Sequence, residues 1–134
     1  MRVEDYLLTS TLNAVLAQRL VRVLCKHCKQ PQQAPQKFID DCHKNHIEAS
    51  SDAQIYSAKG CDECSGTGYT GRTCIVELLC LDDEIKKRIL EHADANELQK
   101  IAINNGMKTM YQDGLTKVLN GITTLEEITR ITKE

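Results

Sequence analysis

The sequence predicts a mostly α-helical protein with a small β element and a zinc knuckle. Two Cys-x-x-Cys pairs predict a metal-organised subdomain, an apolar run after the second pair predicts a strand, and apolar residues at three- and four-residue spacing predict helices elsewhere. We expect an amphipathic helix, then a tetracysteine zinc subdomain with short strands, and then a C-terminal bundle of about four short helices. The corresponding ranges are 1–24, 25–81 and 82–134.

The composition of the chain argues against two classes of function. Its 134 residues include 17 basic and 19 acidic side chains, and the formal net charge is −2. Nucleic-acid binding needs a clustered basic excess, and one Phe, four Tyr and no Trp offer few aromatic platforms for bases. No apolar run approaches the roughly 18 residues of a membrane span. We therefore expect neither a nucleic-acid partner nor direct membrane insertion.

Residues 6–24 are predicted to form one amphipathic helix. Neither Gly nor Pro interrupts this stretch, and its apolar residues recur at helical steps: Leu8, Leu12, Val15, Leu16, Leu20 and Leu24. Leaving such a stripe in water forgoes about 1.5 kcal/mol or more for each side chain that burial would cover. We expect the isolated chain to cover the stripe by self-association through residues 7–24, most simply as a two-fold dimer.

The first cysteine pair is Cys25 and Cys28, and the second is Cys61 and Cys64. This spacing aims two sulfurs at one ion, and four thiolates form the closed tetrahedral shell of structural zinc. Two disulfides, or free buried thiols, are the alternatives. The acidic stretch 1–5 is followed by no apolar signal core, and a reducing compartment favours metal thiolates over disulfides.

A closed cysteine shell is unsuited to catalysis. A catalytic zinc keeps one position open for water or substrate, and four cysteine ligands leave none. His27 is the only base near the first pair, and no residue pattern predicts a catalytic or cofactor-binding side chain. His43 and His46 are expected to be solvent-exposed, because no ligand is missing. The roles of these histidines and of Cys42 stay open.

Short elements and connectors surround the second cysteine pair. The Pro-bounded stretch 31–35 predicts an exposed connector, 36–48 a short helix and 55–58 a short strand. The glycine-rich stretch 65–72 predicts a turn wrapped against the metal site. A phosphate loop is the alternative, but no Lys-Ser, Lys-Thr or helix start follows the glycines.

Residues 73–81 form the clearest predicted strand, and its Cys74 and Cys80 are expected to be small buried hydrophobes. Four short helices are predicted after it, because the apolar spacing becomes helical at Asp82. Their start and stop signals are Asp82-Asp83-Glu84, Asp94 or Asn96, Asn105-Gly106, Asn120-Gly121, and a capping box at Thr123-Thr124-Leu125-Glu126.

Several stretches, taken together, resemble the C-terminal region of the bacterial type II secretion and type IV pilus assembly ATPases. The matching stretches follow the family's order along nearly the whole chain. They are Leu16-Ala17-Gln18-Arg19-Leu20-Val21-Arg22, the two cysteine pairs, Gly68-Tyr69-Thr70-Gly71-Arg72, Glu77-Leu78-Leu79, Asp113-Gly114-Leu115 and Gly121-Ile122-Thr123-Thr124-Leu125-Glu126-Glu127.

The resemblance implies a hexameric cytoplasmic motor, peripheral to the inner membrane, that powers assembly of a pilus or pseudopilus. In this family the tetracysteine subdomain binds zinc and projects from the catalytic core. The implied partners are that ATPase core, neighbouring subunits of the hexamer and inner-membrane platform proteins. We expect the zinc to act mechanically, as a stiff lever that passes nucleotide-driven movement of the core to such a partner.

The chain departs from the family pattern where nucleotide binding is concerned. The family's phosphate-binding loop, Walker B segment, and acidic and histidine boxes lie upstream, and no Gly-Lys dipeptide of a GxxxxGK[ST] loop occurs here. We therefore expect a C-terminal piece of a longer motor, either an isolated domain or a truncated reading frame. ATP and Mg²⁺ then belong to the implied parent, and this chain alone is not an enzyme.

Two further resemblances are weaker. Residues 61–68 fit the CxxCxGxG repeat of DnaJ-type chaperones, but those domains use four repeats in two zinc sites and this chain has one repeat. A zinc-ribbon module that binds nucleic acid is disfavoured by the acidic charge balance.

Overall fold

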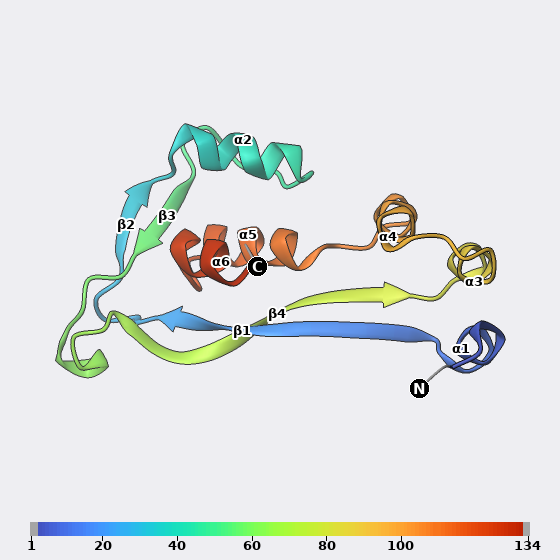
Figure 1. The fold of residues 1–134 in the computed structure, drawn as a ribbon. Coiled ribbons are helices and arrows are strands. Elements are labelled where there is room, and N and C mark those ends of the chain that lie inside the picture. Colours follow the sequence, from blue (N-terminus) through green and yellow to red (C-terminus); the bar gives the residue numbers. More distant parts are fainter. Residues whose placement is uncertain (1–2, 133–134) are drawn as a thin grey trace. The chain divides into compact units, whose positions relative to one another are not determined.

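The computed structural model describes residues 3–132 and contains helices and two small sheets (Figure 1). In chain order the elements are α1 (Asp5–Thr11), β1 (Ala14–Leu24), β2 (Gln30–Gln33), α2 (Gln36–Lys44), β3 (Gln54–Ser57), the 3-10 helix η1 (Asp62–Cys64), β4 (Tyr69–Cys80), α3 (Asp83–Leu90), α4 (Ala95–Asn104), α5 (Met110–Leu119) and α6 (Leu125–Thr132). The predicted fold class, mostly helical with a small β element beside a cysteine cluster, is confirmed.

The chain divides into two compact units, and each is discontinuous in sequence. The first unit joins the residues up to Ala17 to Val76–Thr109, and the second joins Gln18–Ile75 to the residues from Met110 on. The four helices predicted after residue 82 are all present. They form two pairs, with α3 and α4 in the first unit and α5 and α6 in the second.

The prediction of one helix over residues 6–24 is wrong. The helix α1 ends at Thr11, Leu12 is extended, and Ala14–Leu24 forms the strand β1, which pairs with β4 and runs opposite to it (Figure 1). Residues four apart share one side of a strand as well as one side of a helix, so the leucine spacing fits both periods. β-branched valines at alternate positions and the distant partner β4 decide for the strand.

The second unit has its core between the small sheet of β2 and β3, the helix α2 and the last two helices, α5 and α6. β2 and β3 pair antiparallel, with Gln30 opposite Ser57 and Gln33 opposite Gln54. The buried cluster consists of Val21, Ala34, Phe38, Ile39, Cys42, Ile55, Ile75, Leu115, Val118 and Ile128. The predicted helix after residue 36 and the predicted strand near 55 are therefore confirmed, and each contributes apolar side chains to this core.

The expectation of a connector at 31–35 needs correction. Residues 30–33 are exposed, but they form the strand β2, in which Pro31 lies opposite Tyr56. Proline lacks an N–H donor and is therefore confined to edge strands. The small sheet contains only β2 and β3, so both strands are edges and the proline is accommodated.

The first unit has its core where β4 leads into α3. Leu81, Ile85 and Ala102 are buried there, with partly buried apolar neighbours on α3 and α4. The expectation that Cys74 and Cys80 are buried is not met, because Cys74 is half-buried and Cys80 is exposed. Both lie at even positions of β4, whereas buried Ile75 lies at an odd position, and successive strand side chains point to opposite faces.

Helix capping follows the predicted signals with one shift of register. Asp82 and Asp94 each accept a hydrogen bond at 2.8 Å from the backbone N–H three residues ahead, and α4 ends at Asn105-Gly106. For α6, however, the cap is Thr124, whose hydroxyl accepts from the N–H of Glu127 at 3.3 Å. The predicted capping box therefore lies one residue too early. Among the described residues, no helix is long and apolar enough to cross a membrane.

We predict that the purified chain self-associates through the apolar side chains of β1. Val15 and Leu16 are neighbours in this strand and are 47% and 59% exposed. Replacing both with Lys should give a monomer, because charged side chains on exposed strands oppose pairing and burial. Size-exclusion chromatography with light scattering provides the measurement. Leu90→Lys, at a leucine 50% exposed on α3, is the control and should leave association unchanged. If the unsubstituted chain is already a monomer, the prediction is wrong.

Candidate metal centre

The structure brings the four predicted cysteines together. Their Sγ atoms all lie within 4.8 Å of one another, and this is the one such group of potential ligands within residues 3–132. Three of the six Sγ–Sγ distances are 3.8 Å for Cys25 and Cys61, 3.8 Å for Cys28 and Cys64, and 3.7 Å for Cys61 and Cys64, and the other three are at most 4.8 Å. A tetrahedron with metal–sulfur bonds of about 2.3 Å has edges of about 3.8 Å. The sulfurs therefore fit one tetrahedral ion, and all four thiols are free of disulfides.

Each cysteine pair is held by a tight turn of the backbone. Cys25 directly follows β1, and the N–H of Lys29 donates to its carbonyl oxygen at 3.0 Å. Cys61 is extended before the short helix η1, and the N–H of Gly66 donates to the Cys61 carbonyl at 2.8 Å. These turns orient the two sulfurs of each pair toward the same point, which is the reason for the two-residue spacing.

Backbone N–H groups also point at the sulfurs. Gly60 donates to Cys28 Sγ at 3.3 Å, and Gly68 donates to Cys64 Sγ at 3.1 Å. Burial opposes ionisation of the Cys64 thiol, but the N–H donors of Cys61 and Gly68 outweigh it and lower the pKa of Cys64 to about 6. Burial raises the pKa of Cys61 to about 12. The donor set thus favours a thiolate at Cys64, the form that binds metal.

The glycine-rich stretch wraps against the cysteines, as predicted. Gly68 has φ +80°, and a Cβ there would lie 2.6 Å from the Cβ of Ala58. Its carbonyl oxygen accepts from the N–H of Cys25 at 2.9 Å, and its own N–H donates to Cys64. The N–H of Gly68 is directed at Cys64 Sγ, and those of Ser65, Gly66 and Thr67 donate to carbonyl oxygens of residues 61–64. The phosphate-loop alternative therefore gains no support from its geometry.

The histidines lie outside the cysteine cluster. His27, His43 and His46 are exposed, and His43 Nε2 lies 2.8 Å from the carbonyl oxygen of Ala49. Cys42 is fully buried in the core of the second unit, where burial raises its pKa. None of these four residues joins the group of clustered ligands.

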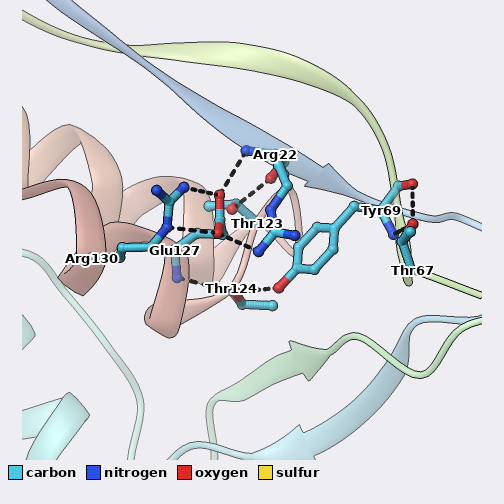
Figure 2. A network of polar contacts seen from close by, with 7 residues as sticks. All are labelled: Arg22, Thr67, Tyr69, Thr123, Thr124, Glu127 and Arg130. Carbon is cyan, nitrogen blue, oxygen red and sulfur yellow. Dashed lines mark hydrogen bonds and ion pairs between the residues drawn. The ribbon is translucent and has the colours of Figure 1, made fainter.

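A buried carboxylate, which the sequence did not reveal, organises the neighbouring polar contacts (Figure 2). Glu127 on α6 is 1% exposed and accepts from the backbone N–H of Arg22 at 3.1 Å and from its guanidinium at 2.6 Å. Arg130 donates to the same carboxylate at 3.1 and 3.3 Å. Arg22 and Glu127 are 105 residues apart in sequence, so no local pattern links them.

Further contacts tie the end of β1 to the loop before α6. The Arg22 guanidinium lies 4.1 Å above the centre of the Tyr69 ring, and the Tyr69 hydroxyl lies 2.9 Å from that of Thr124. Thr123 donates its hydroxyl to the carbonyl oxygen of Arg22 at 2.8 Å. Lys29, one residue after Cys28, donates at 2.8 Å to a backbone carbonyl just after α5. The cysteine cluster is therefore joined to the helical part of the second unit.

The charge of Glu127 is strongly stabilised in the folded chain. Burial alone would raise the pKa of this carboxyl, but hydrogen bonds from Arg22 and Arg130 outweigh burial and lower it from an ordinary value near 4.5 to about 2. The carboxylate form is thus bound more tightly in the folded than in the unfolded chain. Its contribution to stability is full above pH 4.5 and is lost as the pH falls toward 2.

Comparison with known proteins places these features in one family. A family model described as "Type II/IV secretion system protein" matches residues 1–130. The chain is 44% identical over 128 residues to the "Type IV pilus assembly ATPase PilB" of Thermus thermophilus, covering 96% of this chain and 14% of that protein. It is 40% identical over 134 residues to the "Type II secretion system protein E" of Xanthomonas campestris pv. campestris, covering 100% of this chain and 24% of that protein.

A third relative is the "Type II secretion system ATPase E" of Vibrio cholerae serotype O1, 42% identical over 137 residues. The match covers 100% of this chain and 26% of that protein. The chain therefore spans between 14 and 26% of the length of these curated relatives.

We predict that Gly68→Ala destabilises the chain more than Gly66→Ala does. Both glycines have positive φ, +80° and +77°, so both variants bear a similar backbone strain. Only at Gly68 does the new Cβ collide with Ala58; at Gly66 nothing lies within 4 Å. The additional loss for Gly68→Ala should be about 1 kcal/mol or more. Urea unfolding followed by circular dichroism measures it, and equal losses would show that the collision with Ala58 is not the cause.

We predict a pH-dependent loss of stability for Glu127→Gln. A pKa lowered from about 4.5 to about 2 corresponds to about 3 kcal/mol at neutral pH, since one pKa unit is about 1.4 kcal/mol. Glu127→Gln should have a lower unfolding free energy than the unsubstituted chain. This difference should be constant from about pH 5 to 7 and should shrink as the pH falls from 4.5 toward 2.

The matched control is Glu126→Gln, at an exposed position of the same helix. Its effect should stay within about 0.5 kcal/mol. Denaturant titrations of the three proteins across this pH range provide the comparison. A deficit for Glu127→Gln that is independent of pH would mean that the side chain's shape, and not its charge, supports the fold.

Proposed function

The chain belongs to the type II/IV secretion system protein family, and we propose that it serves as the zinc-binding structural and interaction module of a motor ATPase of that family. The observation that supports zinc is the clustering of the four sulfurs within 4.8 Å of one another, with three of their separations at 3.7 or 3.8 Å, the edge of a tetrahedron around one ion. Cys25, Cys28, Cys61 and Cys64 would hold it. Bound there, the ion would supply charge neutralisation and a cross-link, with no open position for a reactant.

The proposed module works as a lever because its metal end is tied to its helical end. Cys25 follows the last residue of β1, and three residues earlier Arg22 is fixed to α6 by Glu127. Lys29 extends the connection from the other side of the first cysteine pair to the turn after α5. A force applied at the cysteine loops is therefore passed to α5 and α6 through short polar contacts.

The wider setting is proposed from the named relatives. Their names describe a type IV pilus assembly ATPase and type II secretion proteins, and this chain spans a minor share of their length. We propose a parent motor that binds ATP and Mg²⁺ and works as a hexamer in the cytoplasm at the inner membrane. The partners of the module are then the ATPase core, neighbouring subunits and the inner-membrane platform proteins.

The chaperone and zinc-ribbon alternatives have less support. The resemblance to DnaJ-type domains covers residues 61–68, whereas the secretion family model covers 1–130. A nucleic-acid role is disfavoured by the net charge of −2.

The proposed zinc site is tested by elemental analysis of reduced, freshly purified protein. We expect about one zinc per chain, since four thiolates complete one tetrahedral shell. Cys25→Ser and Cys64→Ser should lose the metal and lower the midpoint of thermal unfolding, because metal affinity contributes to folding. The control is Cys80→Ser, at an exposed cysteine outside the cluster, which should retain the metal. The proposal would be refuted if the unsubstituted chain contained no metal, or if Cys80→Ser lost as much metal as the cluster variants.

The chain alone should show no ATP hydrolysis. It contains no GxxxxGK[ST] loop, and the N–H groups of residues 65–68 are already bonded to Cys64 Sγ or to carbonyl oxygens of the same turn. Phosphate release should equal that of a buffer control, in the presence of Mg²⁺. Turnover that follows the protein through successive purification steps would show that an unrecognised nucleotide site exists.

A further inference from the structure

A groove in the second unit lies beside the Glu127 network and has no part in the cysteine cluster. Its volume is about 610 Å³. The residues that line it come from β1, the glycine-rich loop, β4 and α6: Leu20, Arg22, Thr67, Tyr69, Gly71, Arg72, Arg130 and Ile131. Figure 2 shows Arg22, Tyr69 and Arg130 of this lining around the buried carboxylate. We call it the arginine groove.

The arginine groove carries an excess of positive charge. Three guanidinium groups line it, and the carboxylate that faces two of them, Glu127, is buried and shared between Arg22 and Arg130. The guanidinium of Arg72 makes no ion pair or side-chain hydrogen bond within residues 3–132 and is exposed. Three positive charges therefore stand against one negative charge that solvent does not reach.

The arginines of the groove are held in place but keep donors to spare. Arg22 is fixed between Glu127 at 2.6 Å and the Tyr69 ring at 4.1 Å, yet its side chain is 50% exposed. Arg130 uses its Nε and one Nη on Glu127, and its side chain is 59% exposed. A guanidinium has five N–H donors, so each retains several for a ligand. Because both are already ordered, a ligand loses less side-chain entropy on binding.

We propose that the arginine groove binds an acidic peptide segment of a partner protein, one in which carboxylates alternate with apolar side chains. Guanidinium groups bind carboxylates in a forked geometry, and exposed Leu20 and neighbouring Ile131 supply apolar surface beside them. A nucleic-acid ligand fits less well. The single aromatic ring of the groove, Tyr69, already has Arg22 over its face and is not free to stack a base.

The groove's proposed role rests on the interaction role proposed above, but it is independent of the metal. Its lining includes none of the four clustered cysteines, and all its residues belong to the second unit. Zinc content and peptide binding are therefore separate readouts. A chain that holds zinc but does not bind the peptide would overturn the groove's assignment and leave the metal site standing.

The test is fluorescence anisotropy of the full chain with a labelled synthetic peptide of repeating Glu-Leu-Asp units. We expect saturable binding that weakens with added salt, and none to the matching Gln-Leu-Asn peptide. Arg72→Gln removes a guanidinium with no side-chain partner within residues 3–132 and should weaken binding about tenfold, the loss typical of one charge-assisted hydrogen bond. Lys37→Gln, an equal charge change at an exposed position of α2, should leave the affinity unchanged.

Two further probes separate the acidic peptide from other anions. Oligothymidine and phosphatidylglycerol vesicles are added to the same chain and to Arg72→Gln. If either binds more tightly than the peptide and in an Arg72-dependent way, the groove serves nucleic acid or lipid and the proposal is wrong. Equal weakening by Arg72→Gln and Lys37→Gln would also overturn it, because binding would then follow net charge and not this groove.

Discussion

The second unit depends on one buried carboxylate. Glu127 compensates for the loss of water by accepting from both arginines and from a backbone N–H of β1. A buried carboxylate is tolerated only when it is paired and hydrogen-bonded in this way. Because β1 ends at the first cysteine pair, the same contact fixes the strand that presents Cys25. The positions of the metal site and of the arginine groove both follow from it.

The cysteine cluster was predictable because its information is local. Two sulfurs two residues apart need only a tight turn, and hydrogen bonds within a few residues of Cys61 provide it. The helix caps at Asp82 and Asp94 are local in the same sense, since each contact spans three residues. The meeting of the two pairs is not local, but it could be predicted because four cysteine ligands complete one tetrahedral metal shell.

The errors arose where distant segments decide the structure. Leu12, Leu16 and Leu20 satisfy a helical and a strand period at once, and only pairing with β4 resolves the ambiguity. Cys80 shows the same limitation, because an apolar run does not reveal which face of a two-stranded sheet is covered. The Glu127 network and the arginine groove form only when Arg22, Tyr69 and α6 come together in the fold. These residues are too far apart in sequence for a local pattern to link them.

The backbone of Gly68 has a consequence for how metal would exchange at the cysteine cluster. One residue reaches both cysteine pairs, accepting from the N–H of Cys25 and donating to the sulfur of Cys64. These bonds do not involve the ion, so they hold the two halves of the site in register whether or not it is filled. A chelator that competes for the ion would therefore face cysteine ligands that are held by the backbone and do not dissociate one by one. Release of the proposed ion would then require local opening of the loop at Gly68 as well as breaking of the metal–sulfur bonds.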